Sequence, residues 1–74
     1  MITARIHRSS EDENGALAQL FTLPRIGESI SMPDENGTER DLRVIGINHL
    51  IKQTNGHLQQ VEVALFCEPT TTLI

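Results

Sequence analysis

The longest regular pattern of apolar and polar residues surrounds the dipeptide Asn55-Gly56. Apolar runs flank this dipeptide, and Asn-Gly is the preferred centre of a type I′ turn because both central residues need a positive φ. Counting outward from the turn gives the cross-strand pairs Thr54–His57, Leu50–Val61 and Val44–Cys67. The pattern therefore predicts a long antiparallel hairpin.

The same register places charged residues opposite one another on the second face of the hairpin. Arg43 is expected opposite Glu68, and His49 opposite Glu62. Both are favourable cross-strand combinations, and a slip by one residue would exchange the faces of one strand. We therefore predict two electrostatic pairs, Arg43–Glu68 and His49–Glu62.

Apolar residues occur on both faces of the predicted hairpin, which indicates that both faces are covered. Gly46 lies inside the first strand, where an isolated glycine often marks a bend or bulge. One face carries an apolar stripe of Ile45, Ile47, Ile51 and Phe66. This stripe is a candidate interface with a second copy or another protein. The alternative is that the N-terminal segment covers it through Leu17, Leu20 and Phe21.

Shorter alternating segments predict three further strands. Residues 2–7 alternate apolar and polar side chains, as do residues 28–32 before Pro33. Residues 16–23 also fit a strand, which we favour. Ser10 and Glu13 instead fit a helical capping box, although a helix would then contain Gly15 at a cost of about 1 kcal/mol. A short helix or 3-10 turn near residues 10–20 is the alternative.

The tetrapeptide Asp-Glu-Asn-Gly occurs at residues 12–15 and again at residues 34–37. Both copies fall between predicted strands, where the chain must reverse. A calcium loop would need further oxygen ligands at defined spacing, ending in a glutamate, and neither copy has them. We interpret both copies as solvated turns, and no metal or cofactor site is predicted.

The chain is short enough to form one domain, which we place at residues 1–68 with a C-terminal tail at residues 69–74. The tail could pair as an edge strand in another chain or stay disordered. The predicted fold is all-β: a small antiparallel barrel, or a strongly bent sheet, of about five strands. Phe21 and Phe66 are the only aromatic residues, so packing against a second copy is expected to assist a small aliphatic core.

Residues 23–67 resemble small bacterial single-domain β-barrels of the Src-homology-3-like type. The resemblance rests on the string from Pro24 to Ile30 (Pro-Arg-Ile-Gly-Glu-Ser-Ile), followed by strands at Val44–Ile47 and Val61–Leu65. In this pattern Gly27 makes the tight turn, and Ile26 and Ile30 point inward. The resemblance implies a fold and is not specific for a function.

The net charge of −4 disfavours nucleic acid and anionic membrane surfaces as partners, since proteins that bind these polyanions concentrate basic residues. No apolar run is long enough for a signal peptide or a transmembrane helix, so the cytoplasm is the expected location. The histidines His7, His49 and His57 are far apart in the sequence and are not expected to form a metal site. Cys67 is expected to be a buried structural thiol.

The sequence contains no recognised catalytic motif, and so small a domain lacks the volume of a typical pocket. We therefore expect a non-catalytic binding or assembly module that acts through protein contacts and forms homo-oligomers. One alternative is a nucleic-acid-associated barrel, which would need a basic face built from Arg5, Arg8, Arg25 and Arg43. Another is a small-ligand carrier or an enzyme accessory subunit.

Overall fold

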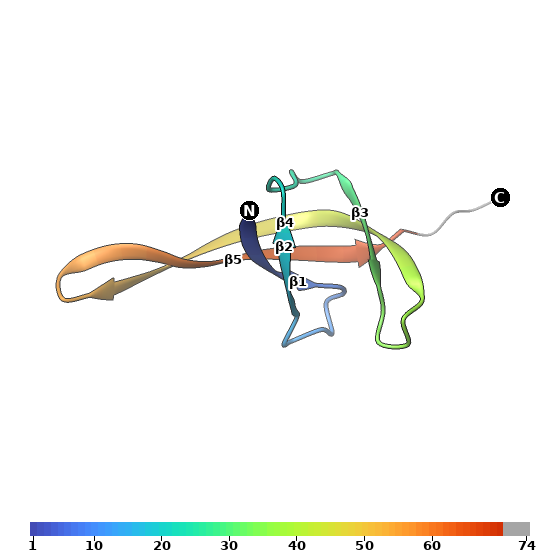
Figure 1. Ribbon diagram of the computed structural model, residues 1–74, viewed down its shortest axis with the longest axis horizontal. Helices are drawn as coiled ribbons and strands as arrows, with labels where there is room; N and C mark the ends of the chain where they lie inside the picture. Colours follow the sequence, from blue (N-terminus) through green and yellow to red (C-terminus); the bar gives the residue numbers. More distant parts are fainter. Residues whose placement is uncertain (71–74) are drawn as a thin grey trace.

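A computed structural model describes residues 1–70 and contains five strands in a single sheet (Figure 1). The strand order across the sheet is β2-β1-β5-β4-β3. The strands are β1 (Ile2–His7), β2 (Ala16–Leu20), β3 (Ser29–Pro33), β4 (Glu39–Thr54) and β5 (His57–Pro69). The predicted all-β fold of about five strands is confirmed, and residues 1–70 contain no helix long and apolar enough to cross a membrane.

The sheet is mixed, so the prediction of wholly antiparallel pairing is wrong. Strand β1 pairs in parallel with β5, with Ile6 opposite Leu65, whereas the other three pairings are antiparallel. The tight turn at Asn55 pairs β5 with β4, and β1 lies on the other edge of β5, with partners 59 positions away in the sequence. This contact follows from tertiary packing, which local sequence patterns do not encode.

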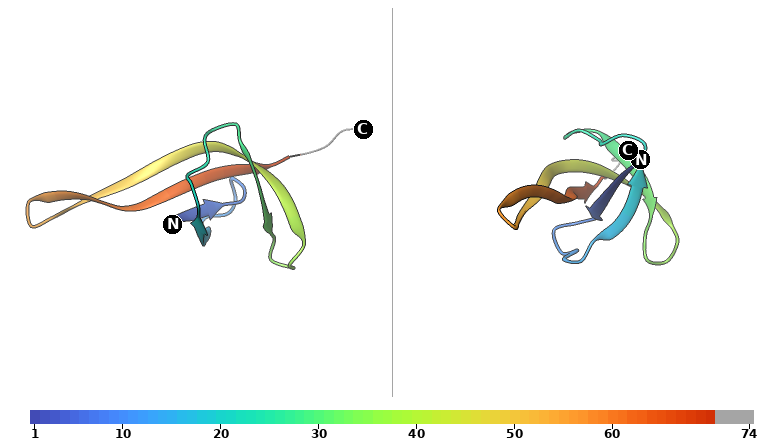
Figure 2. Two further views of the ribbon diagram at one scale, coloured as in Figure 1. Left: turned by 45° about the horizontal axis from the view of Figure 1, so that its top comes forward. Right: turned by 60° about the vertical axis from the view of Figure 1, so that its left-hand side comes forward.

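The sheet curls into a half-barrel around one aliphatic core (Figure 2). Val44 and Leu65 are fully buried at the centre, on the long strands β4 and β5. The outer strands contribute Ala4 and Ile6 from β1 and partly buried side chains from β2 and β3. Neither phenylalanine belongs to this core, since Phe21 is 89% exposed and Phe66 is 41% exposed.

The central hairpin has the predicted type I′ turn but not the predicted regular ladder. Asn55 and Gly56 have φ values of 52° and 82°, and Thr54 faces His57. Register shifts occur between Leu50 and Ile51 and again between Val44 and Gly46. Val61 is therefore unopposed on β5, and Ile45 is unopposed on β4. Leu50 consequently faces Glu62 instead of Val61, while Val44 faces Cys67 as predicted.

The favoured strand prediction for residues 16–23 is confirmed over Ala16–Leu20, and the helix alternative is wrong. Gly15 directly precedes the strand and has a φ of 65°, which is incompatible with a helix interior. Ala16 and Ala18 face Ile6 and Ala4 across the ladder. Ala18 packs against the core from this edge of the half-barrel.

The segment between β2 and β3 departs from the expected pattern at one residue. Gly27 makes the expected turn with a φ of 95°, and its N–H donates to the carbonyl of Val44 at 2.8 Å. Ile30 packs against the core, but Ile26 is 65% exposed instead of pointing inward. The turn at Gly27 thus attaches β3 to β4 without burying Ile26.

Both Asp-Glu-Asn-Gly segments form turns, as interpreted from the sequence. Asp12 accepts hydrogen bonds from the N–H groups of Arg8 and Gly15 at 2.9 and 3.0 Å. Asp34 accepts from the N–H groups of Asn36 and Thr38 in the same manner. Each aspartate therefore stabilises its own chain reversal.

The C-terminal end of β5 extends slightly beyond the predicted domain boundary. Strand β5 continues to Pro69, and the N–H of Thr70 donates to the carbonyl of Asp41 at 3.1 Å. Pro69 thus belongs to the β4–β5 ladder, and Thr70 is joined to Asp41 just beyond it. The remaining residues, 71–74, lie outside the described part of the chain.

Candidate functional site

The most exposed part of the molecule is a two-stranded arm formed by residues 48–61 (Figure 1). The neighbouring strands do not reach it, because β3 pairs with β4 only up to Arg43 and β1 pairs with β5 only from Ala64. Every residue of the arm is exposed. The arm projects beyond the ends of the three shorter strands (Figure 1).

Apolar side chains lie on this arm without protein cover. Leu58 is 76% exposed, Ile51 is 55% exposed and Val61 is 51% exposed, while Leu50 at the base is 38% exposed. An isolated two-stranded ribbon is at best marginally stable in water. The exposed apolar surface of the arm is therefore a candidate functional site.

The arm has an unusual charge composition. Lys52 is its only residue with a full charge at neutral pH, and no aspartate or glutamate occurs between Asn48 and Val61. The other polar residues are amides, a threonine and two histidines, and Gln60 Nε2 lies 3.1 Å from His49 Nδ1. Few charges therefore protect the arm from pairing with other strands.

The four predicted interface residues do not form one stripe. Phe66 lies opposite Gly46, whereas Ile47 lies opposite Leu65 and packs against the core. Ile45 occupies the bulge and is 49% exposed, and Ile51 lies on the arm. The prediction of a continuous stripe is wrong because each bulge exchanges the face on which the following residues lie.

Leu17, Leu20 and Phe21 do not cover the predicted interface residues, so that alternative is also wrong, although His7 of β1 stacks on Phe66. Strand β2 lies at the far edge of the sheet, separated from β5 by β1. Leu17 is 61% exposed and Phe21 is 89% exposed, while Leu20 packs against the core. Ile45, Ile51 and Phe66 therefore stay accessible in the described structure.

The predicted pair His49–Glu62 is replaced by a pair between Glu62 and Arg5. Arg5 Nε donates to Glu62 Oε1 at 3.0 Å, and the register shift places His49 opposite Val63. Arg43 does lie opposite Glu68, as predicted. Within residues 1–70, however, no ion pair within 4.0 Å joins these two side chains.

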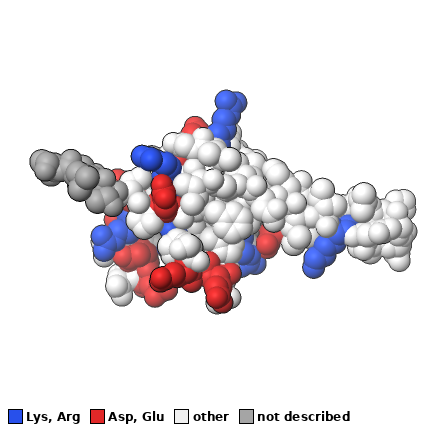
Figure 3. Space-filling view, turned by 180° about the vertical axis from the view of Figure 1, so that it is seen from behind, with Lys and Arg blue, Asp and Glu red and all other residues white. Residues whose placement is uncertain are grey.

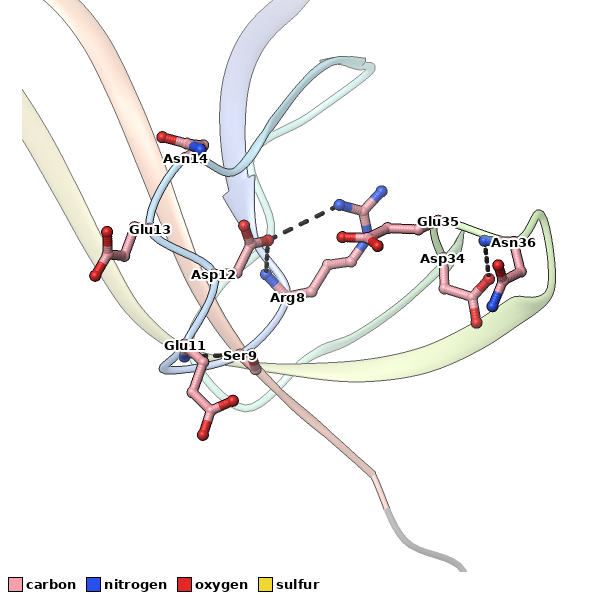
Figure 4. Close-up of a pocket in the computed structure, with 9 residues that line it drawn as sticks. All are labelled: Arg8, Ser9, Glu11, Asp12, Glu13, Asn14, Asp34, Glu35 and Asn36. Carbon is pink, nitrogen blue, oxygen red and sulfur yellow. Dashed lines mark hydrogen bonds and ion pairs between the residues drawn. The ribbon is translucent and has the colours of Figure 1, made fainter.

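A second feature is an acidic cleft of about 580 Å³ between the two Asp-Glu-Asn-Gly turns (Figure 4). Arg8 crosses between the turns: its Nη2 donates to the carbonyl of Pro33 at 3.1 Å, and its Nη1 lies 3.8 Å from Asp12 Oδ2. The carboxylates that line the cleft are Glu11, Asp12, Glu13, Asp34 and Glu35. No local sequence pattern indicates that these turns lie side by side, and the expectation that so small a domain lacks the volume of a typical pocket is wrong.

The carboxylates of this cleft do not converge on one point. The N–H of Arg8 donates to Asp12 and holds the pKa of that carboxyl below its usual value, and the Arg40 side chain does the same for the pKa of Asp34. Glu11 and Glu13 point away from Arg8 (Figure 4). Within residues 1–70, no group of three His, Cys, Asp or Glu side chains could hold a metal ion.

Most of the remaining candidate residues are buried or paired with other side chains. Cys67 is 2% exposed, and burial raises the pKa of its thiol, which disfavours the reactive thiolate. His7 stacks on Phe66 with ring centroids 4.9 Å apart, far along the sheet from His57 at the arm tip. Of the four arginines proposed for a basic face, Arg5 pairs with Glu62 and Arg8 with Asp12.

Acidic side chains gather on the half-barrel, while the arm in the same view shows no acidic residue (Figure 3). The only sequence signals for the arm were its two apolar faces and its low charge. No family model, curated protein or solved structure matches the chain. The arm and the cleft are therefore assessed by the exposure, charge and contacts of their residues.

Proposed function

We propose that this protein is a non-catalytic assembly module that binds protein partners through the arm formed by residues 48–61. The observation that carries the proposal is the exposure of every residue of the arm, including Leu58 at 76% and Ile51 at 55%. Exposed apolar surface on an otherwise folded domain is typical of a protein interaction site. Homo-oligomerisation through this surface is the expected mode, and another protein is the alternative partner.

Removing the arm without disturbing the core tests this function. Deletion of residues 51–54 and 57–61 lets Asn55-Gly56 connect Leu50 directly to Glu62, which already face each other. The deleted residues are all exposed, so the half-barrel should still fold. Light scattering at two concentrations should give the parent chain a mass above 8.2 kDa and the shortened chain the mass of one copy.

A pair of point variants separates lost apolar contact from added charge. Leu58 and Gln53 face each other on the arm, so Leu58→Lys and Gln53→Lys add the same charge at the same place. Only Leu58→Lys removes apolar surface, and it should lower the oligomer fraction more strongly. Equal effects of the two variants would contradict a role for the apolar surface.

The proposal fails under two outcomes. In the first, the shortened chain keeps the oligomeric mass of the parent, so that the contact lies elsewhere. In the second, the parent is a single chain at both concentrations, and affinity columns carrying parent and shortened chain retain the same proteins. A column that captures a protein only through the arm would support a heterologous partner instead.

We further propose that the fold is related to Src-homology-3-like barrels and that the protein is located in the cytoplasm. The curled five-stranded sheet is compatible with such a small barrel. The buried free thiol of Cys67 is compatible with a reducing compartment. An experimental structure compared strand by strand with known small barrels tests the first, and fractionation of cells that express the tagged chain tests the second.

A further inference from the structure

The chain exposes more surface than a compact monomer of its mass. Its accessible surface is 5818 Å², whereas a compact monomer of 8.2 kDa exposes about 4,500 Å². The uncovered arm, residues 48–61, contributes to this excess, and each partner of a standard interface buries roughly 800 Å².

The arm and the half-barrel differ in charge. Lys52 gives the arm a formal charge of +1, so the rest of the chain carries −5 within the total of −4. Two half-barrels therefore repel each other, whereas an arm and a half-barrel attract. A second copy can satisfy both conditions only if the two half-barrels lie far apart.

Both strands of the arm have a free main-chain edge. On the edge of β4 that faces β3, Val44 is the last residue with a main-chain hydrogen bond: its N–H donates to the carbonyl of Glu28 at 2.9 Å. The outer edge of β4 beyond this point, and that of β5 before Ala64, pair with no other strand within residues 1–70. Such edges can pair with another strand, and the apolar side chains beside them would then be buried.

We propose that the arm binds the arm of a second copy, with the two arms antiparallel around a two-fold axis near the Ile51–Gln60 pair. This inference rests on the proposed assembly function and adds its partner and geometry. The antiparallel arrangement places the two acidic half-barrels at opposite ends and brings each Lys52 toward the half-barrel of the partner copy. The contact is isologous and closes as a dimer, so it does not propagate into a fibre.

Thiol crosslinking at two positions of β5 tests the geometry. Gln60→Cys introduces a thiol at the middle of the arm, and His57→Cys introduces one beside the turn at its tip. The parent chain is the control, because Cys67 is only 2% exposed. In an antiparallel dimer the two mid-arm thiols are close together, whereas the two tips are at opposite ends.

With a short bis-maleimide, Gln60→Cys should give at least about tenfold more covalent dimer than His57→Cys, since only its thiols have a high effective concentration. Circular dichroism should show the same β-structure in both variants. Light scattering of the uncrosslinked parent should give twice the mass of one chain. Crosslinking by His57→Cys that equals or exceeds that by Gln60→Cys would overturn the antiparallel geometry.

The remaining outcomes separate this inference from the proposed function. A parent oligomer larger than a dimer that the shortened arm dissolves would leave the assembly function standing and overturn the two-fold dimer. If the parent is a monomer whose arm captures a different protein, the assembly function would likewise stand and the two-fold dimer would be overturned. A single-chain parent with no arm-dependent partner would overturn both.

Discussion

Ile45 on β4 and Val61 on β5 are the two unopposed residues of the central ladder, and the register shifts that they introduce cancel each other. Between them, each pair is displaced by one residue from a regular hairpin, and outside them the regular pairing returns. The bulge at Ile45 lets Val44 and Ile47 both pack toward the core although they are three positions apart. The predicted register is therefore correct at both ends of the hairpin and wrong between the bulges.

Gly46 is not required by the local backbone, so we predict that Gly46→Ala stabilises the protein. A Cβ atom built at Gly46 would lie 3.6 Å from Phe66 Cβ, which is an ordinary contact, and Gly46 is not among the residues with positive φ. Alanine should raise the free energy of unfolding by about 0.5 kcal/mol, since glycine in a strand loses more backbone entropy on folding. Urea unfolding measures the change.

Gly15→Ala is the matched comparison for this prediction. Gly15 has a φ of 65°, and a Cβ atom there would lie 2.7 Å from Arg5 Cγ. This variant should lower the free energy of unfolding by about 1–2 kcal/mol because of backbone strain and the steric clash. A loss of stability from Gly46→Ala as large as that from Gly15→Ala would show that the backbone at position 46 does require glycine.

Two leucines on the same strand should differ strongly when each is truncated to alanine. Leu65 is fully buried in the core, whereas Leu58 is 76% exposed on the arm. Leu65→Ala should lower the free energy of unfolding by about 2–5 kcal/mol, enough to unfold much of so small a domain. Leu58→Ala should change it by less than about 0.5 kcal/mol when measured on single chains. A large loss from Leu58→Ala in the single-chain state would show that the arm belongs to the folded core.

The charge of Asp12 should make stability depend on pH in the acid range. The N–H groups of Arg8 and Gly15 lower the pKa of this carboxyl in the folded state. Its contribution is therefore present above the unfolded pKa of about 3.9 and is lost as the pH falls through the lower folded pKa. In urea unfolding between pH 3 and pH 7, Asp12→Asn should flatten the acid side of the stability profile.

Glu13→Gln is the control for this experiment, because it removes the same charge from the same turn. Asp12 accepts two backbone hydrogen bonds, whereas Glu13 points outward in Figure 4. The profile of Glu13→Gln should follow that of the parent chain more closely than the profile of Asp12→Asn. The reverse order would mean that general charge repulsion determines the acid sensitivity.

Glu62 should be energetically coupled to Arg5 and not to His49. Arg5 Nε lies 3.0 Å from Glu62 Oε1, and both side chains are about one-third exposed. A double-mutant cycle with Arg5→Gln and Glu62→Gln should give a coupling of about 0.2–1 kcal/mol, as is typical of exposed pairs. A cycle with His49→Gln and Glu62→Gln should give no measurable coupling. A larger coupling there would support the regular register, in which His49 faces Glu62.

Local signals accounted for the elements of the fold. Asn55-Gly56 predicted the type I′ turn because few residues tolerate positive φ, and the two aspartates of the acidic turns provided the side-chain acceptors that chain reversals use. Alternation predicted β1 and β3, and Gly15 weighed correctly against a helix for residues 16–20. Each of these features depends on residues that are close together in the sequence.

The candidate site depended on contacts that local patterns do not contain. Gly46 correctly indicated the bulge at Ile45, but no local pattern indicated the second bulge at Val61, and the assignment of Ile47 and Phe66 to one apolar stripe failed. The pair between Arg5 and Glu62 joins residues 57 positions apart and requires the parallel contact of β1 with β5. The exposure of the arm followed only from where β1 and β3 end.

The sequence by itself determined the strands, the turns and the small aliphatic core, because backbone preferences and alternation act over a few residues. The tertiary structure decided which edge of β5 received β1, where the ladder shifted, and which residues stayed uncovered. These outcomes depend on the packing of distant strands around Val44 and Leu65, where burial of apolar surface outweighs the regularity of the ladder. The arm remained uncovered because the shorter strands β1 and β3 end before reaching it.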